Sequence, residues 1–151
     1  MFRVRARERE VLLVHPGGPY FRKKDEGSWT IPKGEVTTGE DLLSRARVEF
    51  QEELGMAASS EDRIPLGEVK QKGGKIVHAW AFEGDLAEGF TLRSNSFEME
   101  WPPRSGIRVM FPEVDRAEFF PLEKARMKIN AAQSAFLDRL ATELAARGER
   151  N

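Results

Sequence analysis

Three glutamates, Glu49, Glu52 and Glu53, follow one another at the spacing i, i+3, i+4. On a helix this spacing places the three carboxylates on one face, with neighbouring Cβ atoms about 5–6 Å apart. Carboxylate oxygens bind hard ions such as Mg²⁺ and Mn²⁺, and Mg²⁺ usually shares its coordination shell with water and substrate phosphates. The trio therefore predicts a divalent-metal site, with a solvated helix face as its alternative.

A helix has to position these carboxylates, and the apolar residues around them predict one. They recur at helical spacing from Glu40 onwards, at Leu43, Ala46, Phe50 and Leu54. Gly55 stands where a helix ends in a left-handed residue. The pattern predicts an amphipathic helix that packs on a sheet through this stripe and turns its glutamates away from the stripe.

The composition limits the classes of protein to which this chain can belong. Its 151 residues are 40% hydrophobic and 32% charged, which predicts a single folded domain over 1–151. The 24 basic and 25 acidic residues nearly cancel, which argues against a general nucleic-acid partner. The sequence contains no cysteine, so thiol nucleophiles and thiolate metal sites are excluded. No apolar run is long enough for a membrane span or a secretory segment, and we expect a cytoplasmic protein.

The remaining patterns predict strands and helices along one α+β domain. Strands are expected at 1–5, 11–14, 64–72, 75–82 and 116–120, with a hairpin turn at Gly73–Gly74. Residues 85–107 are expected to form a long excursion with at most short strands. Helices are expected at 122–129 and along the stripe Ala132, Phe136, Leu140 and Leu144, ending at Gly148. The architecture that follows is a mixed sheet covered by helices.

The stretch 34–56 reads GEVTTGEDLLSRARVEFQEELGM and resembles the Nudix box, G-x5-E-x7-R-E-U-x-E-E-x-G-U, where U is a bulky apolar residue. The matching residues are Gly34, Glu40, Glu49, Phe50, Glu52, Glu53, Gly55 and Met56. One position departs, because Val48 stands where the family has arginine. Arg45, one helical turn before Glu49, is the better placed of the nearby arginines to replace it.

The flanks of the box extend the resemblance. Residues 28–34 and 111–119, and a following helix with Gln133, are similar to segments of the family's dinucleoside polyphosphate hydrolases. The resemblance implies an α/β/α sandwich that uses Mg²⁺ or Mn²⁺ to hydrolyse a nucleoside diphosphate linked to another group. The leading substrate is a dinucleoside polyphosphate such as diadenosine tetraphosphate. The alternatives are a catalytically silent Nudix fold that binds nucleotide or protein, and an RNA 5′-end or inositol pyrophosphohydrolase.

The resemblance and the chemistry together nominate site residues. The metal set is Glu49, Glu52, Glu53 and Gly34, and the same glutamates are the first candidates for catalysis. A general base must reach the attacking water, and Glu98 or Glu100 is the further candidate, with a solvated strand face as the alternative reading. The substrate contacts expected are Lys33, Gly34 and Tyr20, the last as a surface for base stacking.

The two histidines and the oligomeric state complete the expectations. His78 falls within a strand pattern and is expected to be structural, whereas His15 precedes Pro16 and can lie near the site. Monomer and homodimer both stay open.

Overall fold

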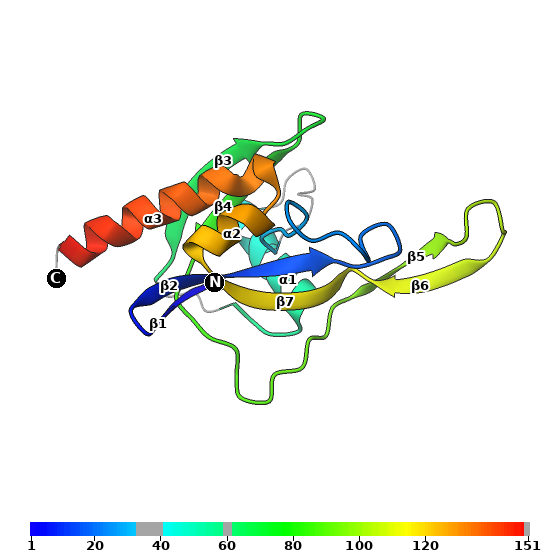
Figure 1. Ribbon diagram of the computed structural model, residues 1–151, viewed down its shortest axis with the longest axis horizontal. Coiled ribbons are helices and arrows are strands. Elements are labelled where there is room, and N and C mark those ends of the chain that lie inside the picture. Colours follow the sequence, from blue (N-terminus) through cyan, green and yellow to red (C-terminus); the bar gives the residue numbers. More distant parts are fainter. Residues whose placement is uncertain (33–40, 59–61, 150–151) are drawn as a thin grey trace.

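The computed structural model describes residues 1–32, 41–58 and 62–149, and its elements follow one another as strands and helices in mixed order (Figure 1). Their bounds are β1 Phe2–Arg5, β2 Glu8–Pro16, α1 Leu42–Leu54, β3 Ile64–Lys70, β4 Ile76–Ala81, β5 Ser96–Glu100, β6 Arg108–Pro112, β7 Val114–Pro121, α2 Leu122–Lys128, the 3₁₀ turn η1 Ala131–Gln133 and α3 Ser134–Glu149. No helix in these described ranges is both long and apolar enough to cross a bilayer.

Strand β2 is the centre of the fold. It pairs antiparallel with β1 on one side and with β7 on the other, so Val11 lies between Phe2 and Phe120. Its continuous apolar run is buried on both faces, as expected for a strand covered on two sides. Val11 and Leu13 pack into one hydrophobic cluster and Leu12 and Val14 into another. Successive side chains of β2 point to opposite faces of the sheet and thus belong to two separate halves of the core.

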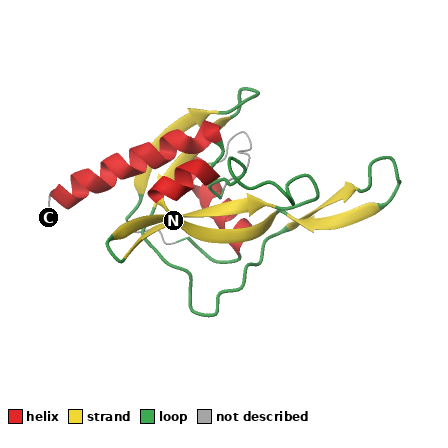
Figure 2. Ribbon diagram, viewed as in Figure 1, coloured by secondary structure: helices red, strands yellow, loops and turns green. Residues whose placement is uncertain are grey.

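Helices cover both halves, which gives the α/β/α sandwich. Phe136 and Leu140 of α3 and Ala125 of α2 pack with Leu13. Figure 2 shows α2 and α3 on the same side of the strands. Phe50 and Leu54 of α1 pack with Leu12 and Val14 on the opposite face. The α+β fold with helices on both faces of the sheet is therefore confirmed.

The other strands are joined to this centre by hairpins and isolated bridges. β3 and β4 form an antiparallel hairpin, and Gly73 and Gly74 occupy positive φ in its turn, as the sequence predicts. A parallel bridge between Phe2 and Glu83 connects the segment after β4 to β1, and this contact gives the strands their mixed character. The segment 11–14 expected as a strand lies wholly inside β2.

Strand β6 is the element that the sequence does not predict. The excursion 85–107 does contain one short strand, β5, but β5 pairs with a partner at Arg108–Pro112. Figure 1 shows the two as a hairpin that reaches out from the rest of the molecule. The residues of the hairpin alternate largely between partly buried and exposed. Cross-strand pairs such as Phe97 with Phe111 stabilise these two short strands.

Helix α1 has a defined beginning and end. Asp41 caps its amino terminus by accepting a hydrogen bond from Ser44 N at 3.0 Å, and Gly55 ends it at φ 79° with its N–H donated to Gln51 O. The predicted stop at Gly55 is confirmed. The predicted stop at Gly148 is wrong by at least one residue, because α3 continues to Glu149. A glycine inside a last exposed turn costs too little to end a helix by itself.

The crowding around Gly55 yields a stability prediction. A Cβ at this position would lie 2.8 Å from both the Cβ and the O of Arg93, in addition to sitting at positive φ. Gly27 has nearly the same φ, +77°, with nothing within 4 Å of its ideal Cβ. We expect Gly27→Ala to lower the free energy of unfolding by about 1–2 kcal/mol through backbone strain alone. Gly55→Ala adds a steric clash with Arg93, so it should lower the free energy of unfolding by about 1–3 kcal/mol more than Gly27→Ala does.

Urea denaturation of the two variants and the unmodified chain measures the difference. Equal losses for Gly55→Ala and Gly27→Ala would contradict the close approach of Arg93 to the end of α1.

Candidate active site

The carboxylate trio lies on α1 and two of its members are buried. Glu49 is 6% and Glu53 9% exposed, whereas the Glu52 side chain is 35% exposed. Phe50 and Leu54 anchor the helix in the core on the sheet side and so fix its rotation. Burying unpaired carboxylates is costly, so their presence on a packed helix needs a compensating charge.

Arg45 supplies part of that charge. Its guanidinium forms an i,i+4 ion pair with Glu49 and lies 3.7 Å from Glu52. The pairing expected between Arg45 and Glu49 is thereby confirmed. Val48, at the position where the family motif has arginine, is 42% exposed. Arg45 therefore reaches two glutamates of the trio from the preceding turn.

A fourth acidic residue, Glu113, lies beside the trio. It joins β6 to β7, and backbone hydrogen bonds hold it on both sides: its N–H donates to Asn95 O at 2.8 Å and its O accepts from Gly17 N at 2.9 Å. A Cβ on Gly17 would sit 1.9 Å from Pro112 O, so only glycine permits this approach. Burial, and then the charges of Glu49 and Glu52, raise the pKa of Glu113 above its ordinary value.

A cavity of about 560 Å³ opens at this acidic end. Its wall includes Glu53 and Glu113, the aromatic ring of Phe21, the amine-bearing Lys24 and the amides Gln71 and Asn130. The volume is in the range typical of small-molecule sites. A cavity that joins buried carboxylates to an aromatic surface and polar amides suits a polar ligand that carries a ring.

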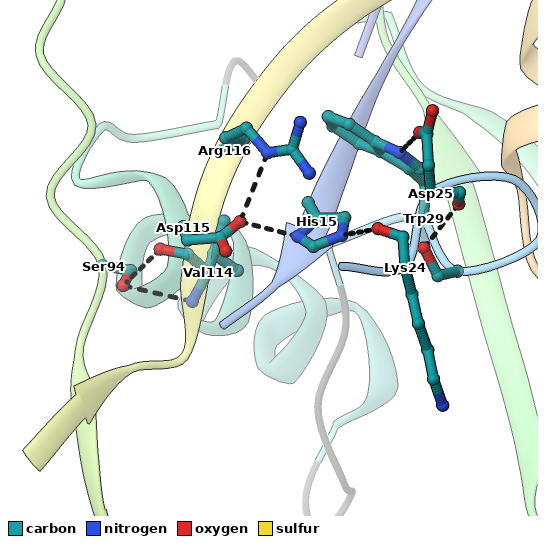
Figure 3. A network of polar contacts seen from close by, with 9 residues as sticks. His15, Lys24, Asp25, Trp29, Ser94, Val114, Asp115 and Arg116 are labelled. Atoms are coloured by element: carbon teal, nitrogen blue, oxygen red, sulfur yellow. Dashed lines mark hydrogen bonds and ion pairs between the residues drawn. The ribbon is translucent and has the colours of Figure 1, made fainter. Parts of the chain in front are cut away.

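The loop that forms one wall of this cavity is tied to the sheet through His15. The His15 ring is 0% exposed, with Nδ1 2.7 Å from Asp115 Oδ1 and Nε2 2.7 Å from the Lys24 carbonyl oxygen (Figure 3). A carbonyl only accepts, so Nε2 is the donor there. Nδ1 faces Asp115 on the other side, so the ring bridges β7 and the loop. His15 thus holds the Lys24 backbone at the cavity edge.

Asp25 holds the next part of the same loop. Its carboxylate pairs with Lys128 Nζ at 2.5 Å and accepts from Trp29 Nε1 at 2.8 Å, and these two contacts lower the pKa of Asp25. Trp29 is buried and lies edge-on to His15, with ring centroids 5.1 Å apart. Trp29 is therefore a core residue.

Two glutamines connect the opposite wall to the core. Gln133, 0% exposed, accepts from Ile31 N at 3.0 Å and donates from Nε2 to Gln71 Oε1 at 3.0 Å. Ile31 follows the isolated bridge between Val14 and Thr30, and Gln71 comes directly after β3. Gln133 therefore links three separate segments at the cavity.

Comparisons with known proteins decide the family. The model of the NUDIX domain matches residues 1–140 of the chain. The chain belongs to the NUDIX family. This membership confirms the resemblance of the 34–56 stretch to the Nudix box and the hydrolase class that it implies.

Individual Nudix proteins show how far the similarity extends. The chain is 31% identical over 105 residues to the oxidized purine nucleoside triphosphate hydrolase of Danio rerio. The aligned residues make up 63% of this chain and 67% of that protein. A C. elegans Ap4A hydrolase binary complex superposes with a TM-score of 0.67 at 21% identity, over 96% of this chain and 94% of that one. The NUDIX domain of Shewanella oneidensis NrtR, complexed with ADP ribose, gives 0.62 at 14% identity, over 95% and 82%.

The other nominated residues of this Nudix domain lie apart from the cavity or outside the described chain. Tyr20 is 58% exposed and packs edge-on against Trp101, with ring centroids 5.3 Å apart. Glu100 accepts from Gly106 N at 3.1 Å on the projecting hairpin and does not line the cavity. Lys33 and Gly34 lie outside the described residues.

The remaining acidic and histidine candidates have partners away from the trio. Glu98 pairs with Arg108 at 3.1 Å on the same projecting hairpin. His78 sits in β4, 3.4 Å from Glu68, in agreement with a structural role.

The donor chemistry of the site fits a hard divalent cation. Within residues 1–32, 41–58 and 62–149, no three acidic or histidine side chains are grouped so as to hold a metal ion by themselves. Mg²⁺ does not require such a group, since it binds one or two carboxylates and completes its shell with water and substrate phosphates. Burial, and then repulsion by Glu49 and Glu52, raise the pKa of Glu113, and a cation would relieve that repulsion.

The raised pKa of Glu113, caused by burial and then by repulsion, gives a pH-dependent stability prediction. Because the pKa of Glu113 is raised in the folded chain, the folded state loses stability relative to the unfolded state as Glu113 ionises with rising pH. Glu113→Gln removes that loss, so we expect a higher Tm than the unmodified chain at pH 7 without divalent cations. The difference should vanish below about pH 4, where the carboxyl is protonated in both states.

Thermal unfolding in EDTA between pH 3.5 and 8 measures the effect, with the exposed Glu118→Gln as the charge-matched control. A Glu113→Gln variant no more stable than Glu118→Gln at pH 7 would show that ionised Glu113 does not destabilise the folded chain.

Proposed function

We propose that this protein is a divalent-metal-dependent pyrophosphohydrolase that cleaves a phosphoanhydride in a nucleoside diphosphate linked to another group. The observation that carries the proposal is the shared cavity: Glu53 and Glu113 line it together, and Glu49 and Glu52 lie close enough to raise the pKa of Glu113. Such a cluster of oxygen ligands beside a nucleotide-sized cavity favours phosphoanhydride chemistry.

The proposed roles follow from position. Glu49, Glu52 and Glu53 would hold Mg²⁺, with Mn²⁺ as a substitute, and Gly34 is the further ligand that the motif implies. The bound cation supplies charge neutralisation at the phosphoryl oxygens and a more acidic water. Arg45 orients Glu49 and Glu52 through its ion pairs.

Glu113 is our candidate for accepting the proton of the attacking water, in preference to Glu100. A carboxylate with a raised pKa is a stronger base than an ordinary one, and Glu113 borders the same cavity as Glu53. Glu100 stays on the projecting hairpin, where its carboxylate accepts from a backbone N–H.

A dinucleoside polyphosphate such as diadenosine tetraphosphate is the proposed substrate. The similarity of residues 28–34 and 111–119 to the family's dinucleoside polyphosphate hydrolases supports this choice. The ring of Phe21 in the cavity wall supports a substrate that carries a base. An oxidised purine nucleoside triphosphate is the next substrate to test, because the 31% identical relative is named for that activity. Residues 1–151 would act as one domain in the cytoplasm, as monomer or homodimer.

A second candidate function is a silent Nudix module that binds nucleotide without turnover. The observation that favours it is Val48 in place of the family's arginine. Calorimetry separates the two functions, because tight nucleotide binding without cleavage of the phosphoanhydride would identify the module. Triphosphorylated RNA and inositol pyrophosphates belong in the same activity panel, where turnover of either in preference to nucleotides would redirect the substrate assignment.

Glu53 lies in the wall of the cavity, where its charge can be removed by substitution. Glu53→Gln keeps the size of the side chain but removes the charge at the cavity, and we expect kcat for diadenosine tetraphosphate with Mg²⁺ to fall by at least about 100-fold. The exposed Glu118→Gln should leave kcat unchanged. Chromatographic quantification of the product nucleotides measures both. An unimpaired Glu53→Gln would remove this residue from the metal set.

A second prediction tests whether Arg45 replaces the family's arginine. Arg45→Ala leaves Glu49 buried without its ion-pair partner and should lower kcat about tenfold. Val48→Arg alone should change kcat little, but in the Arg45→Ala background it should recover part of the loss. A large gain from Val48→Arg in the otherwise unmodified chain would show that Arg45 does not fill the role, and would support the silent-module reading.

A further inference from the structure

Two amide side chains, Gln71 and Asn130, line the cavity from different segments, and both have their oxygens engaged by the protein. Gln71 lies just after β3, and Asn130 lies between α2 and η1. An amide whose oxygen is engaged can offer only its NH₂ group to a ligand. The hydrogen bonds to neighbouring residues determine which end of each amide faces the cavity.

The orientation of the Gln71 amide follows from a chain of donors and acceptors. The Ile31 backbone N–H can only donate, so the atom of Gln133 that faces it at 3.0 Å is Oε1. The other end of the Gln133 amide is therefore Nε2, which can only donate. Nε2 lies 3.0 Å from Gln71, so Gln71 must present Oε1 to it. Gln71 Nε2 is left on the other side, with two hydrogens to donate.

The burial of Gln133 makes this orientation difficult to reverse. Gln133 is 0% exposed, so turning its amide would face its NH₂ group to the Ile31 N–H and leave both without an acceptor. Gln71 is only partly buried and has no comparable constraint of its own. The orientation of Gln71 is thus imposed from the core.

The amide of Asn130 likewise has its oxygen bound by the protein and its NH₂ group left over. Its Oδ1 accepts from Ala132 N at 2.9 Å, which caps η1, so Nδ2 is the other end of the amide. In the part of the chain that the structure describes, neither Gln71 Nε2 nor Asn130 Nδ2 has a protein acceptor. Carboxylates such as Glu26, Glu53 and Glu113 also border the cavity and only accept when ionised, whereas Lys24 on the loop is a further donor.

We infer that Gln71 is a substrate-binding residue that donates hydrogen bonds to acceptor atoms of the ligand, and that Gln133 is the positioning residue that turns its NH₂ group toward the cavity. The inference rests on the proposed nucleotide site and adds to it the residues that select acceptors. The acceptors are non-bridging phosphate oxygens or the ring nitrogens and carbonyls of a base. Asn130 provides a second donor on the same wall.

Gln71→Glu tests the donor directly. The carboxylate still accepts from Gln133 Nε2 but presents an oxygen to the ligand in place of an NH₂ group. Calorimetry would use a methylene-bridged, non-hydrolysable analogue of diadenosine tetraphosphate, with tripolyphosphate as a base-free probe, both with Mg²⁺. We expect affinity for the analogue to fall about tenfold or more. Lys72→Gln, an exposed change of equal charge on the next residue, should leave affinity unchanged.

The two probes locate the acceptor. A parallel loss for tripolyphosphate would assign Gln71 to phosphate oxygens, and a loss confined to the analogue would assign it to the nucleoside. Affinity of Gln71→Glu within twofold of the unmodified chain for both probes would overturn the inference while leaving the proposed function standing. No binding of either probe by the unmodified chain would instead refute the proposed function, and this inference with it.

Gln133→Glu tests the positioning role without touching the ligand. Its carboxylate accepts from Ile31 N and can only accept from Gln71, so Gln71 must turn and face its oxygen to the cavity. We expect the same loss of analogue affinity as for Gln71→Glu, and a shift of the Gln71 side-chain NH₂ resonances in ¹⁵N NMR spectra that confirm a folded chain. A folded Gln133→Glu that keeps full affinity and unshifted resonances would overturn the role of Gln133; should it not fold, Gln133→Met with the same readouts takes its place.

Discussion

The burial of Glu113 beside the charges of Glu49 and Glu52 is the constraint on which the rest of the structure depends. Like charges held close together in a partly buried site repel more strongly than they do in water. Packing of Phe50 and Leu54 prevents α1 from turning its glutamates to solvent, and the backbone on either side of Glu113 holds that residue in place. Arg45 offsets only part of the charge. The cation that we propose for this site would offset the remaining charge.

The cavity beside these glutamates is shaped by polar residues in the core. His15 fixes the loop at Lys24 from one side, and Gln133 fixes Gln71 and Ile31 from the other. Buried polar side chains of this kind hold one geometry, because each alternative leaves a donor or an acceptor without a partner. The α/β/α sandwich supplies the rigid frame, and the hydrogen bonds of His15 and Gln133 set the positions of the loops that border the ligand.

Local signals were sufficient for α1 and for most strands, since the stripe at Leu43 to Leu54, the stop at Gly55 and the turn at Gly73–Gly74 are encoded by neighbours in the chain. Strand β6 was missed because its conformation depends on pairing with β5 rather than on its own residues. The partner of His15 is Asp115, a hundred positions away, and Gln133 and Gln71 are 62 apart, so no local pattern reveals either contact. Glu113 was present in the closing segment 111–119, but its role depends on the approach of that segment to α1.

Manganese soaking with anomalous X-ray scattering tests the central claim most directly. Crystals soaked with Mn²⁺ and a non-hydrolysable nucleotide should show an anomalous peak against the carboxylates of Glu53 and its neighbours on α1, with the phosphates of the nucleotide in contact with it. A nucleotide bound elsewhere, or bound at this cavity with no anomalous peak near α1, would contradict the account.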